Sequence, residues 1–392
     1  MNLFKTEIPL LALAQAIAQS GSIHLTTTGA LIGLTLSGSE ALSTWPASAV
    51  VLTTLSVTIP ASFFMARYGR KAGFLLGFAV GIGGALLAIA GITQGNFITF
   101  TVGAGMMGFL FAFAGYLRFA AVELVEPEWK SRAISLVLAG GVIAAFLGPS
   151  LSKWGLTLVS GAVFAGGYIL WLPLALFGAV LISFARFKPA TQTQLSIAHS
   201  IRHLVTHATL PGVIVLGTGA YVVMAMIMTA TPLAMHHHHM GFEATTQVIR
   251  SHMLGMFVPS FFTGHLIRYL GVRTVIVLGS ALYAACIAIN FMGIGYWQFL
   301  SSLVLLGVGW NFLFVAASQL LTARIAPEYQ SAAQALNDFV IASGIALSIA
   351  FTGKMHEVLG WQWLNMVTIP VILLLVAIGY RLSQTTDSES KS

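Results

Sequence analysis

The sequence predicts an all-α membrane protein whose twelve transmembrane helices form two pseudo-symmetric six-helix bundles. Only 7% of the 392 residues are charged and 57% are hydrophobic, whereas a soluble domain carries about 25% charged residues. The apolar runs reach the roughly 20 residues that a bilayer-spanning helix needs, and they lack the alternating pattern of barrel strands. Short motifs also recur in the same order in the two halves. This composition excludes a soluble enzyme.

Clusters of charged and turn-forming residues divide the chain into twelve apolar segments. The first carries Gln15, Gln19 and His24 and has no clear small-residue cleavage site, so we expect a retained span and not a signal peptide. The single cysteine, Cys286, lies inside an apolar run, which argues against a disulfide framework or a thiolate metal cluster. In chain order the expected spans cover residues 9–34, 45–66, 73–92, 97–119, 133–151, 161–184, 210–234, 246–267, 274–292, 297–321, 332–352 and 363–382.

The longest polar interruption separates the sixth span from the seventh. It predicts an N-terminal six-helix bundle at residues 1–185, a cytoplasmic linker at 186–208 and a C-terminal six-helix bundle with a short cytoplasmic tail at 209–392. Lys and Arg concentrate in the loops on the side of the N-terminus. The positive-inside rule therefore places both termini in the cytoplasm and the protein in the inner (plasma) membrane. Because the net charge of +7 is spread over many loops, nucleic acid is not an expected partner.

Two motifs recur at equivalent places in the two halves. Residues 127–131 (PEWKS) return as residues 327–331 (PEYQS), in both cases between the fourth and fifth spans of the half. The basic loop at residues 67–71 (RYGRK), after the second span, returns at residues 268–273 (RYLGVR). Each echo is short, but both occupy matching places in a six-plus-six topology, so we infer a duplicated architecture.

The basic loops resemble the G-x-L-x-D-R-x-G-R-K pattern of the major facilitator superfamily, and the resemblance covers essentially the whole chain. The first copy departs from the pattern with Ser62 in place of glycine and Ala66 in place of the acid, and the second has Arg268 at the acid position. The resemblance implies the major facilitator fold and a monomeric secondary transporter that works by alternating access. It also implies a gating role for the loop residues Arg67, Gly69, Arg70, Lys71, Arg268, Gly271 and Arg273.

Energy source and direction follow from two further patterns. No Walker-type G-x-x-x-x-G-K-[ST] run occurs, so an ion gradient or the substrate's own gradient is the expected source of energy. The fifth span carries Gly140-Gly141 and Gly148-Pro149, similar to a pattern of many exporters in this family. That similarity favours efflux by an antiporter over uptake, although small residues at such spacing also let helices pack closely.

Charged residues inside or at the margins of spans are candidates for coupling, because a charge in the membrane is unfavourable unless it is paired or wet. These residues are Arg118, Glu123, Arg250 and Asp338. Asp338 lies deepest and is the leading proton-coupling candidate, with Glu123 second. The alternatives are an interhelical lock for Asp338, snorkelling or substrate contact for Arg118, and a place in the inner gate for Glu123. Protons are therefore the expected counter-ion.

Polar and aromatic groups within the spans are candidates for the substrate cavity. Gln15 and Gln19 are four residues apart and share a helix face, and His24 is expected near it. The remaining candidates are Arg118, Trp310, Asn311 and Asn337. For Trp310 and Asn311 interhelical hydrogen bonding is the favoured alternative, and for His24 it is a histidine satisfied within the packed core. The few fixed charges favour a small hydrophobic or amphipathic solute.

Four consecutive histidines, residues 236–239, end the seventh span. Imidazoles bind zinc, nickel and copper, and on a helix His236 and His239 would be the pair able to reach one ion. His252 is the third predicted ligand, and His356 is a further candidate. The alternative is a polar cap on the span with incidental metal affinity.

These histidines leave two other functions open. One is transport of a metal ion or metal chelate, and the other, from a different class, is a membrane-embedded metal-dependent enzyme. The enzyme is disfavoured because no H-E-x-x-H arrangement or adjacent deep carboxylate accompanies the run. No cofactor is expected beyond a divalent metal at these histidines.

Overall fold

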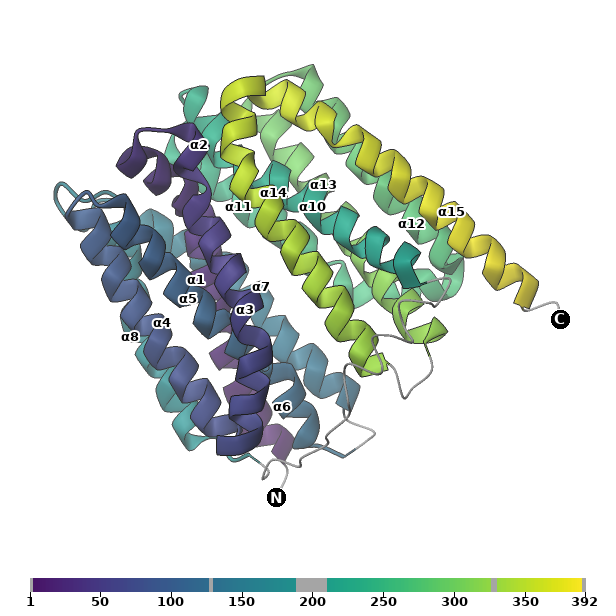
Figure 1. Ribbon diagram of the computed structural model, residues 1–392, viewed down its shortest axis with the longest axis horizontal. Coiled ribbons are helices and arrows are strands. Elements are labelled where there is room, and N and C mark those ends of the chain that lie inside the picture. The colour runs from purple at the N-terminus through teal and green to yellow at the C-terminus, as the bar shows by residue number, and fades with distance from the viewer. Residues whose placement is uncertain (1–2, 127–129, 188–209, 326–329, 390–392) are drawn as a thin grey trace. The chain divides into compact units, whose positions relative to one another are not determined.

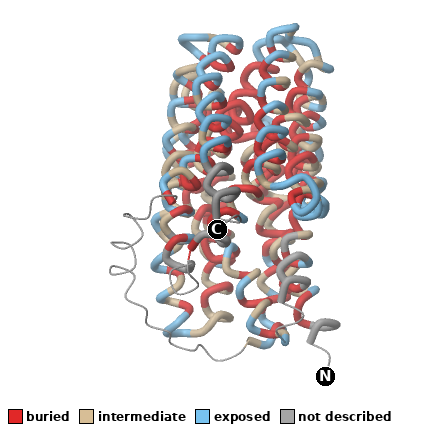
Figure 2. Tube along the Cα trace, turned by 90° about the vertical axis from the view of Figure 1, so that its right-hand side faces the viewer, coloured by how far each residue is buried: buried red, intermediate tan, exposed pale blue. Residues whose placement is uncertain are grey.

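The computed structural model describes residues 3–126, 130–187, 210–325 and 330–389, and these residues are almost entirely helical. The chain separates into two compact units, Met1–Thr193 and Gln194–Ser392, each a bundle of long helices (Figure 1). Buried positions lie mainly on the inward faces of the helices, and exposed positions lie on the outer faces and at the helix ends (Figure 2). Large apolar side chains are among the exposed ones, including Phe63, Ile98, Phe184, Phe262 and Trp297, each at least 65% exposed. Such an apolar exterior suits lipid and not water.

The described residues of the first unit form eight helices. Predicted span four is interrupted near Gly115 and Tyr116, and predicted span six begins after Phe164, which has a left-handed φ of 73°. The closest helix pairs are α4 with α5, α1 with α7 and α3 with α5. The helices are α1 (Leu3–Ser37), α2 (Glu40–Ser43), α3 (Trp45–Tyr68), α4 (Arg70–Thr93), α5 (Phe97–Ala114), α6 (Leu117–Glu123), α7 (Lys130–Trp154) and α8 (Ala165–Phe184).

Glycines of α7 allow it to approach α1 closely. A Cβ atom at Gly140 would lie 2.6 Å from the carbonyl oxygen of Ala12, and one at Gly148 would lie 2.7 Å from Cβ of Ile23. Both distances are too short for a real contact, so larger residues would push the helices apart. Packing within the unit is therefore a sufficient reason for the glycine pattern of α7.

A buried carboxylate joins the beginning of the first unit to its end. Glu7, near the start of α1, is only 4% exposed, and its Oε2 accepts a hydrogen bond of 2.9 Å from the backbone N–H of Arg186, just beyond α8. Because the backbone donor satisfies the carboxylate, its burial is tolerated. The bond ties the first helix of the unit to the last.

In the part of the second unit that the structure describes there are six helices, two of which contain a sharp turn. Gly271 (φ 81°, ψ 152°) divides α12, and Gly360 (φ 72°, ψ 176°) divides α14. A break at Val258 and Pro259 separates α11 from α12, so predicted span eight extends across both helices. The helices are α10 (Leu210–His237), α11 (Phe242–Phe257), α12 (Ser260–Met292), α13 (Tyr296–Arg324), α14 (Gln330–Val367) and α15 (Ile369–Glu389).

Within the described residues, nine continuous helical segments are long and apolar enough to cross a membrane. The difference from twelve has three sources. Predicted spans eleven and twelve merge into the segment Leu336–Arg381, α11 alone has only 16 residues, and the side chains of α7 are described only in part. Helices thus occupy all twelve predicted positions, although their boundaries differ.

Candidate functional site

An aromatic cluster on α10 and α13 is the most distinctive polar and aromatic site of the second unit. Trp310 and Phe314 lie one turn apart on α13, with parallel rings (10°) whose centroids are 5.1 Å apart. The ring of Tyr221, from α10, stands edge-on to both, at 5.0 and 5.1 Å. Tyr221 and Phe314 are half-buried and Trp310 is buried. Edge-to-face contacts of this kind fix all three rings.

Trp310 also presents a hydrogen-bond donor to this cluster. Its indole Nε1 is buried and has no hydrogen-bond partner among the described residues. An unsatisfied buried donor is destabilising by about 1–3 kcal/mol. Such a group marks a place where a ligand or a water molecule can accept a hydrogen bond.

Asn337 lies one turn of α10 away from the cluster, and Asp338 follows it on α14. A Cβ added at Gly217 of α10 would lie 3.6 Å from Oδ1 of Asn337, which places this amide close to α10. Tyr221 is four residues further along the same face of α10. The Nδ2 group of Asn337 donates a hydrogen bond of 3.2 Å to Oδ1 of Asp338, whose side chain is exposed. We call Tyr221, Trp310, Phe314, Asn337 and Asp338 the α10–α13–α14 site.

Asn311 does not belong to this site, because its amide is occupied elsewhere. Its Nδ2 donates to the carbonyl oxygen of Met256 (2.7 Å) and to Oγ of Ser260 (2.5 Å), and its Oδ1 accepts from Thr263 (2.5 Å). These partners flank the break between α11 and α12. Asn311 therefore fastens α13 to that break, as the packing alternative predicted.

In the first unit, the predicted cavity residues of α1 separate into two environments. Gln15 and Gln19 are half-buried, and Nε2 of Gln15 donates to Oε1 of Gln19 at 3.2 Å, so they share a face as predicted. His24 is instead fully buried, with Nδ1 2.7 Å from Oγ of Ser152 and its ring edge-on to Tyr168 at 4.5 Å. The structure thus places His24 in the packed core formed by α1, α7 and α8.

Arg118 and Glu123 point to different surroundings, as their spacing predicted. The guanidinium of Arg118 lies 4.8 Å from the ring centroid of Phe119, and its Nε is buried without a hydrogen-bond partner in the described part of the chain. Glu123 accepts from Nη2 of Arg70 at 2.6 Å. This contact places Glu123 with the first basic loop.

The two basic loops share a backbone conformation. Gly69 (φ 90°, ψ 158°) and Gly271 (φ 81°, ψ 152°) adopt the same glycine-specific geometry. In the first loop Nζ of Lys71 donates to the carbonyl oxygen of Ser183 at 2.8 Å, and Arg67 lies over the ring of Tyr68. In the second loop the guanidinium of Arg273 lies 4.5 Å from the ring centroid of Tyr380, while Arg268 is exposed.

The histidine run ends α10 by a Schellman motif. The N–H of Met240 donates to the carbonyl of Met235 and the N–H of His239 donates to that of His236, both at 3.0 Å. His239 has a left-handed φ of 55°. This is the bond pattern with which helices commonly stop. His236 and His239 are therefore not one turn apart on a continuous helix. The helical i, i+3 spacing that was predicted to let both imidazoles bind one ion is not formed.

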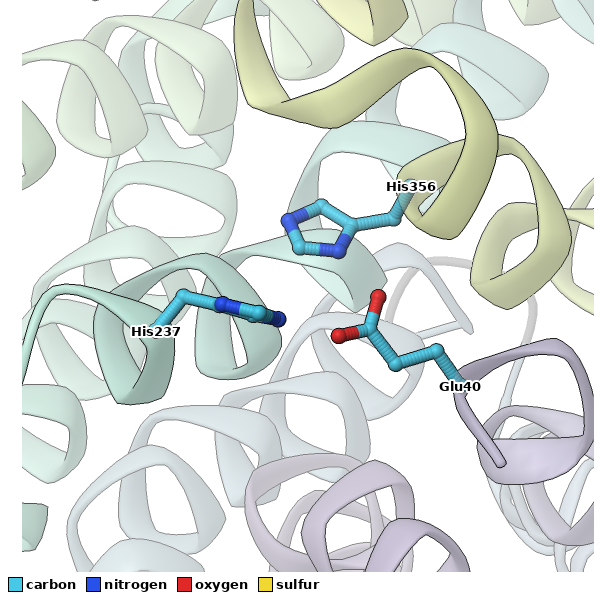
Figure 3. A group of neighbouring side chains, drawn as sticks. All are labelled: Glu40, His237 and His356. Carbon is cyan, nitrogen blue, oxygen red and sulfur yellow. The ribbon is translucent and has the colours of Figure 1, made fainter. Parts of the chain in front are cut away.

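The predicted ligand His252 lies apart from the run. It is fully buried on α11, and its Nδ1 is 2.8 Å from the carbonyl oxygen of Leu303 on α13. Among the described residues, His236, His239 and His252 do not form a group whose ligand atoms come close enough to share an ion. The histidine that meets the run is His356 of α14, whose ring centroid lies 5.5 Å from that of His237 (Figure 3).

Sequence reasoning did not identify Tyr221 and Phe314 as members of a site. Phe314 follows Trp310 at a spacing of four, which is a usable signal for a shared face. Tyr221 is 89 positions before Trp310 in the sequence, and no sequence pattern around Tyr221 predicts their contact. Two apolar cavities of about 450 and 370 Å³ also occur, one along α12 and α13 and one along α3, α4 and α5. Neither contains a predicted cavity residue.

Comparison with known proteins identifies the fold and the family. The family model of the Major Facilitator Superfamily matches residues 11–248 and 213–392. The chain is 33% identical over 382 residues to the riboflavin transporter RfnT of Brucella anthropi, covering 96% of both chains. It is 28% identical to the uncharacterized MFS-type transporter YdeG of Bacillus subtilis, covering 96% of this chain and 91% of that one.

Solved structures show the same fold at low sequence identity. A bacterial homolog of the human lysosomal transporter Spinster, inward-facing and unoccupied, superposes with a TM-score of 0.73 at 14% identity and covers 96% of both chains. The MFS transporter FucP, in the outward conformation, superposes with a TM-score of 0.62 at 14% identity, covering 95% of this chain and 98% of that one. The chain therefore belongs to the Major Facilitator Superfamily, and it is a secondary transporter and not an enzyme.

Proposed function

We propose that this transporter carries a planar, amphipathic heteroaromatic molecule such as riboflavin. The observation that carries the proposal is the cluster of Tyr221, Trp310 and Phe314 with its unsatisfied indole N–H. Half-buried aromatic faces stack on a planar ring system, and the indole N–H donates to a ring carbonyl oxygen. The relative RfnT, named a riboflavin transporter, supports the same substrate class.

Binding of riboflavin to the purified protein tests this proposal. The variant Trp310→Phe keeps the aromatic face and removes the N–H donor, so we expect its Kd to rise about 3-fold to 10-fold, equivalent to one hydrogen bond. Trp297→Phe is the matched control, because Trp297 is 73% exposed at the start of the same helix. Fluorescence titration measures both affinities. Equal affinities in the two variants, or no binding by the wild type, would contradict the proposal.

We also propose that Asp338 couples transport to protons. It is exposed on α14, and its carboxylate accepts a hydrogen bond from Asn337, whose amide lies one turn of α10 from the aromatic cluster. In this proposal, protonation of the Asp338 carboxylate responds to substrate binding without a long chain of proton-transfer groups. The pairing of Glu123 with Arg70 favours a gating role for that residue. The protein is proposed to act as a monomer in the inner membrane, with both termini in the cytoplasm.

Flux in proteoliposomes under an imposed pH gradient tests the coupling. We expect Asp338→Asn to bind riboflavin with wild-type affinity and to lose accumulation against a gradient, while exchange of labelled for unlabelled substrate persists. Concentrative transport by Asp338→Asn would contradict the proposal. The same assay reads direction. Export stays a prediction, and it has lost part of its basis because the glycines of α7 have a packing reason.

A further inference from the structure

The end of α10 brings a histidine of the run against a histidine of α14. His237 is the last residue of α10, and His356 lies shortly before the turn of α14 at Gly360. Their imidazole rings extend toward one another (Figure 3), with centroids 5.5 Å apart and planes inclined by 49°. A ring nitrogen of one lies within 4.8 Å of a ring nitrogen of the other.

This spacing is close to what a shared metal ion requires. Two nitrogens on a tetrahedral zinc, each about 2.0–2.1 Å from it, are about 3.4 Å apart. His237 is exposed and lies at the helix end, so a small rotation of its side chain closes the difference. His356 is only 6% exposed, which holds its ring in place. The pair therefore combines one fixed ligand with one adjustable ligand.

The neighbouring histidines are oriented differently by the helix stop. His238 and His239 follow the last helical residue, and the left-handed φ of His239 turns the chain away from the α10 axis. His238 remains close enough that burial, then the charges of His237, His356 and His239, lower its pKa.

We propose that His237 and His356 together bind a divalent transition metal such as Zn²⁺, linking the end of α10 to α14. Nitrogen ligands of this kind suit zinc, nickel and copper better than calcium or magnesium. Two protein ligands leave coordination positions for water or for His238, so the site is reversible and not a closed structural zinc site. α10 and α14 also carry Tyr221, Asn337 and Asp338, so the metal would join two of the three helices that hold the proposed transport site.

Calorimetric titration of the purified full-length protein with Zn²⁺ tests the proposal. We expect His237→Gln and His356→Gln each to weaken binding about 10-fold or more, because each removes one ligand. His236→Gln is the matched control, since it lies in the same exposed run and is not paired with His356. Its affinity should stay within about 2-fold of the wild type, well under the 10-fold that 1.4 kcal/mol represents.

A second measurement keeps the test independent of folding defects. Zn²⁺ should raise the melting temperature of the wild type and of His236→Gln, because a ligand that binds only the folded state stabilises it. It should leave His237→Gln and His356→Gln unchanged, while all four proteins melt alike in chelator. If His356→Gln binds Zn²⁺ as tightly as the wild type, the run alone holds the metal and the proposal is wrong. This result does not depend on which substrate is carried.

Discussion

The turn between α3 and α4 and the turn inside α12 have the same backbone and different anchors. Gly69 and Gly271 differ by only 9° in φ (90° and 81°) and 6° in ψ (158° and 152°). The first turn is anchored by polar contacts of Arg70 and Lys71, to Glu123 and to the carbonyl of Ser183. The second is anchored by Arg273 over the ring of Tyr380.

The two copies of the basic loop retain the backbone conformation of the glycine and differ in the side chains that hold the turn. At the position of Arg70 the second half has Val272, so an ion pair like that with Glu123 has no cationic member there. The backbone of both turns needs a residue without Cβ, whereas the anchor can be any group that holds a cation. The halves therefore agree in turn geometry and differ in the chemistry that holds each turn to its own unit.

The largest effect is expected from removing the shared glycine. Gly69→Ala and Gly271→Ala should each reduce stability by about 1–3 kcal/mol, because L-residues rarely adopt this backbone conformation. A Cβ at either position meets nothing within 4 Å, so the loss is conformational and not steric. Melting temperatures in detergent measure it.

The matched control for both is Gly264→Ala. Gly264 is helical, and a Cβ there also meets nothing within 4 Å. Alanine should be neutral or stabilising by about 0.5–1 kcal/mol in a helix. If Gly69→Ala destabilises the protein and Gly271→Ala behaves like the control, the two turns do not share one backbone requirement.

An intermediate effect is expected at the second anchor. Tyr380→Leu removes the ring beneath Arg273 and should reduce stability by about 0.5–1 kcal/mol, the range of an exposed cation–π contact. Tyr380→Phe keeps the ring and should melt close to the wild type. A loss in Tyr380→Phe as large as that in Tyr380→Leu would mean that the hydroxyl, and not the ring, holds this turn.

The smallest effect is expected at the first anchor. Arg70 and Glu123 have side chains 20% and 41% exposed, so their ion pair is screened, and Glu123→Gln should reduce stability by roughly 0.5 kcal/mol or less. The difference from the wild type should shrink as salt is raised. Melting curves at low and high salt measure it, and a loss that is large and independent of salt would contradict this assignment.

The sequence predicted what local pattern and composition control. Long apolar runs predicted the helices, and the recurring loops predicted the matching turns at Gly69 and Gly271, because a turn depends on the few residues within it. Gln15 and Gln19 share a face because helical spacing requires it. In α14 the predicted loop at residues 353–362 is helical apart from the turn at Gly360, and predicted span twelve (363–382) runs from the end of α14 into α15.

Contacts between distant residues were beyond the reach of these patterns. Asn311 and Trp310 are neighbours in sequence, and both are polar groups in a span. Asn311 forms hydrogen bonds with Met256, Ser260 and Thr263, whereas the indole N–H of Trp310 has no partner among the described residues. The helix face on which each side chain lies determines whether it finds a partner, and the partners of that face are about 50 residues away in sequence. His24 and His252 likewise sit in packed interiors, which a polar residue in an apolar run does not reveal.

The hydrogen bond between Glu7 and the N–H of Arg186 has a consequence for biosynthesis. It joins the first helix of the first unit to the residue that follows the last, and it needs no residue beyond Arg186. The contact between α1 and the end of α8 can therefore form while the second half of the chain is still being translated. Domains generally fold as units, the N-terminal one first. The buried carboxylate of Glu7 thus gains its hydrogen-bond donor, the N–H of Arg186, when about half of the protein has been made.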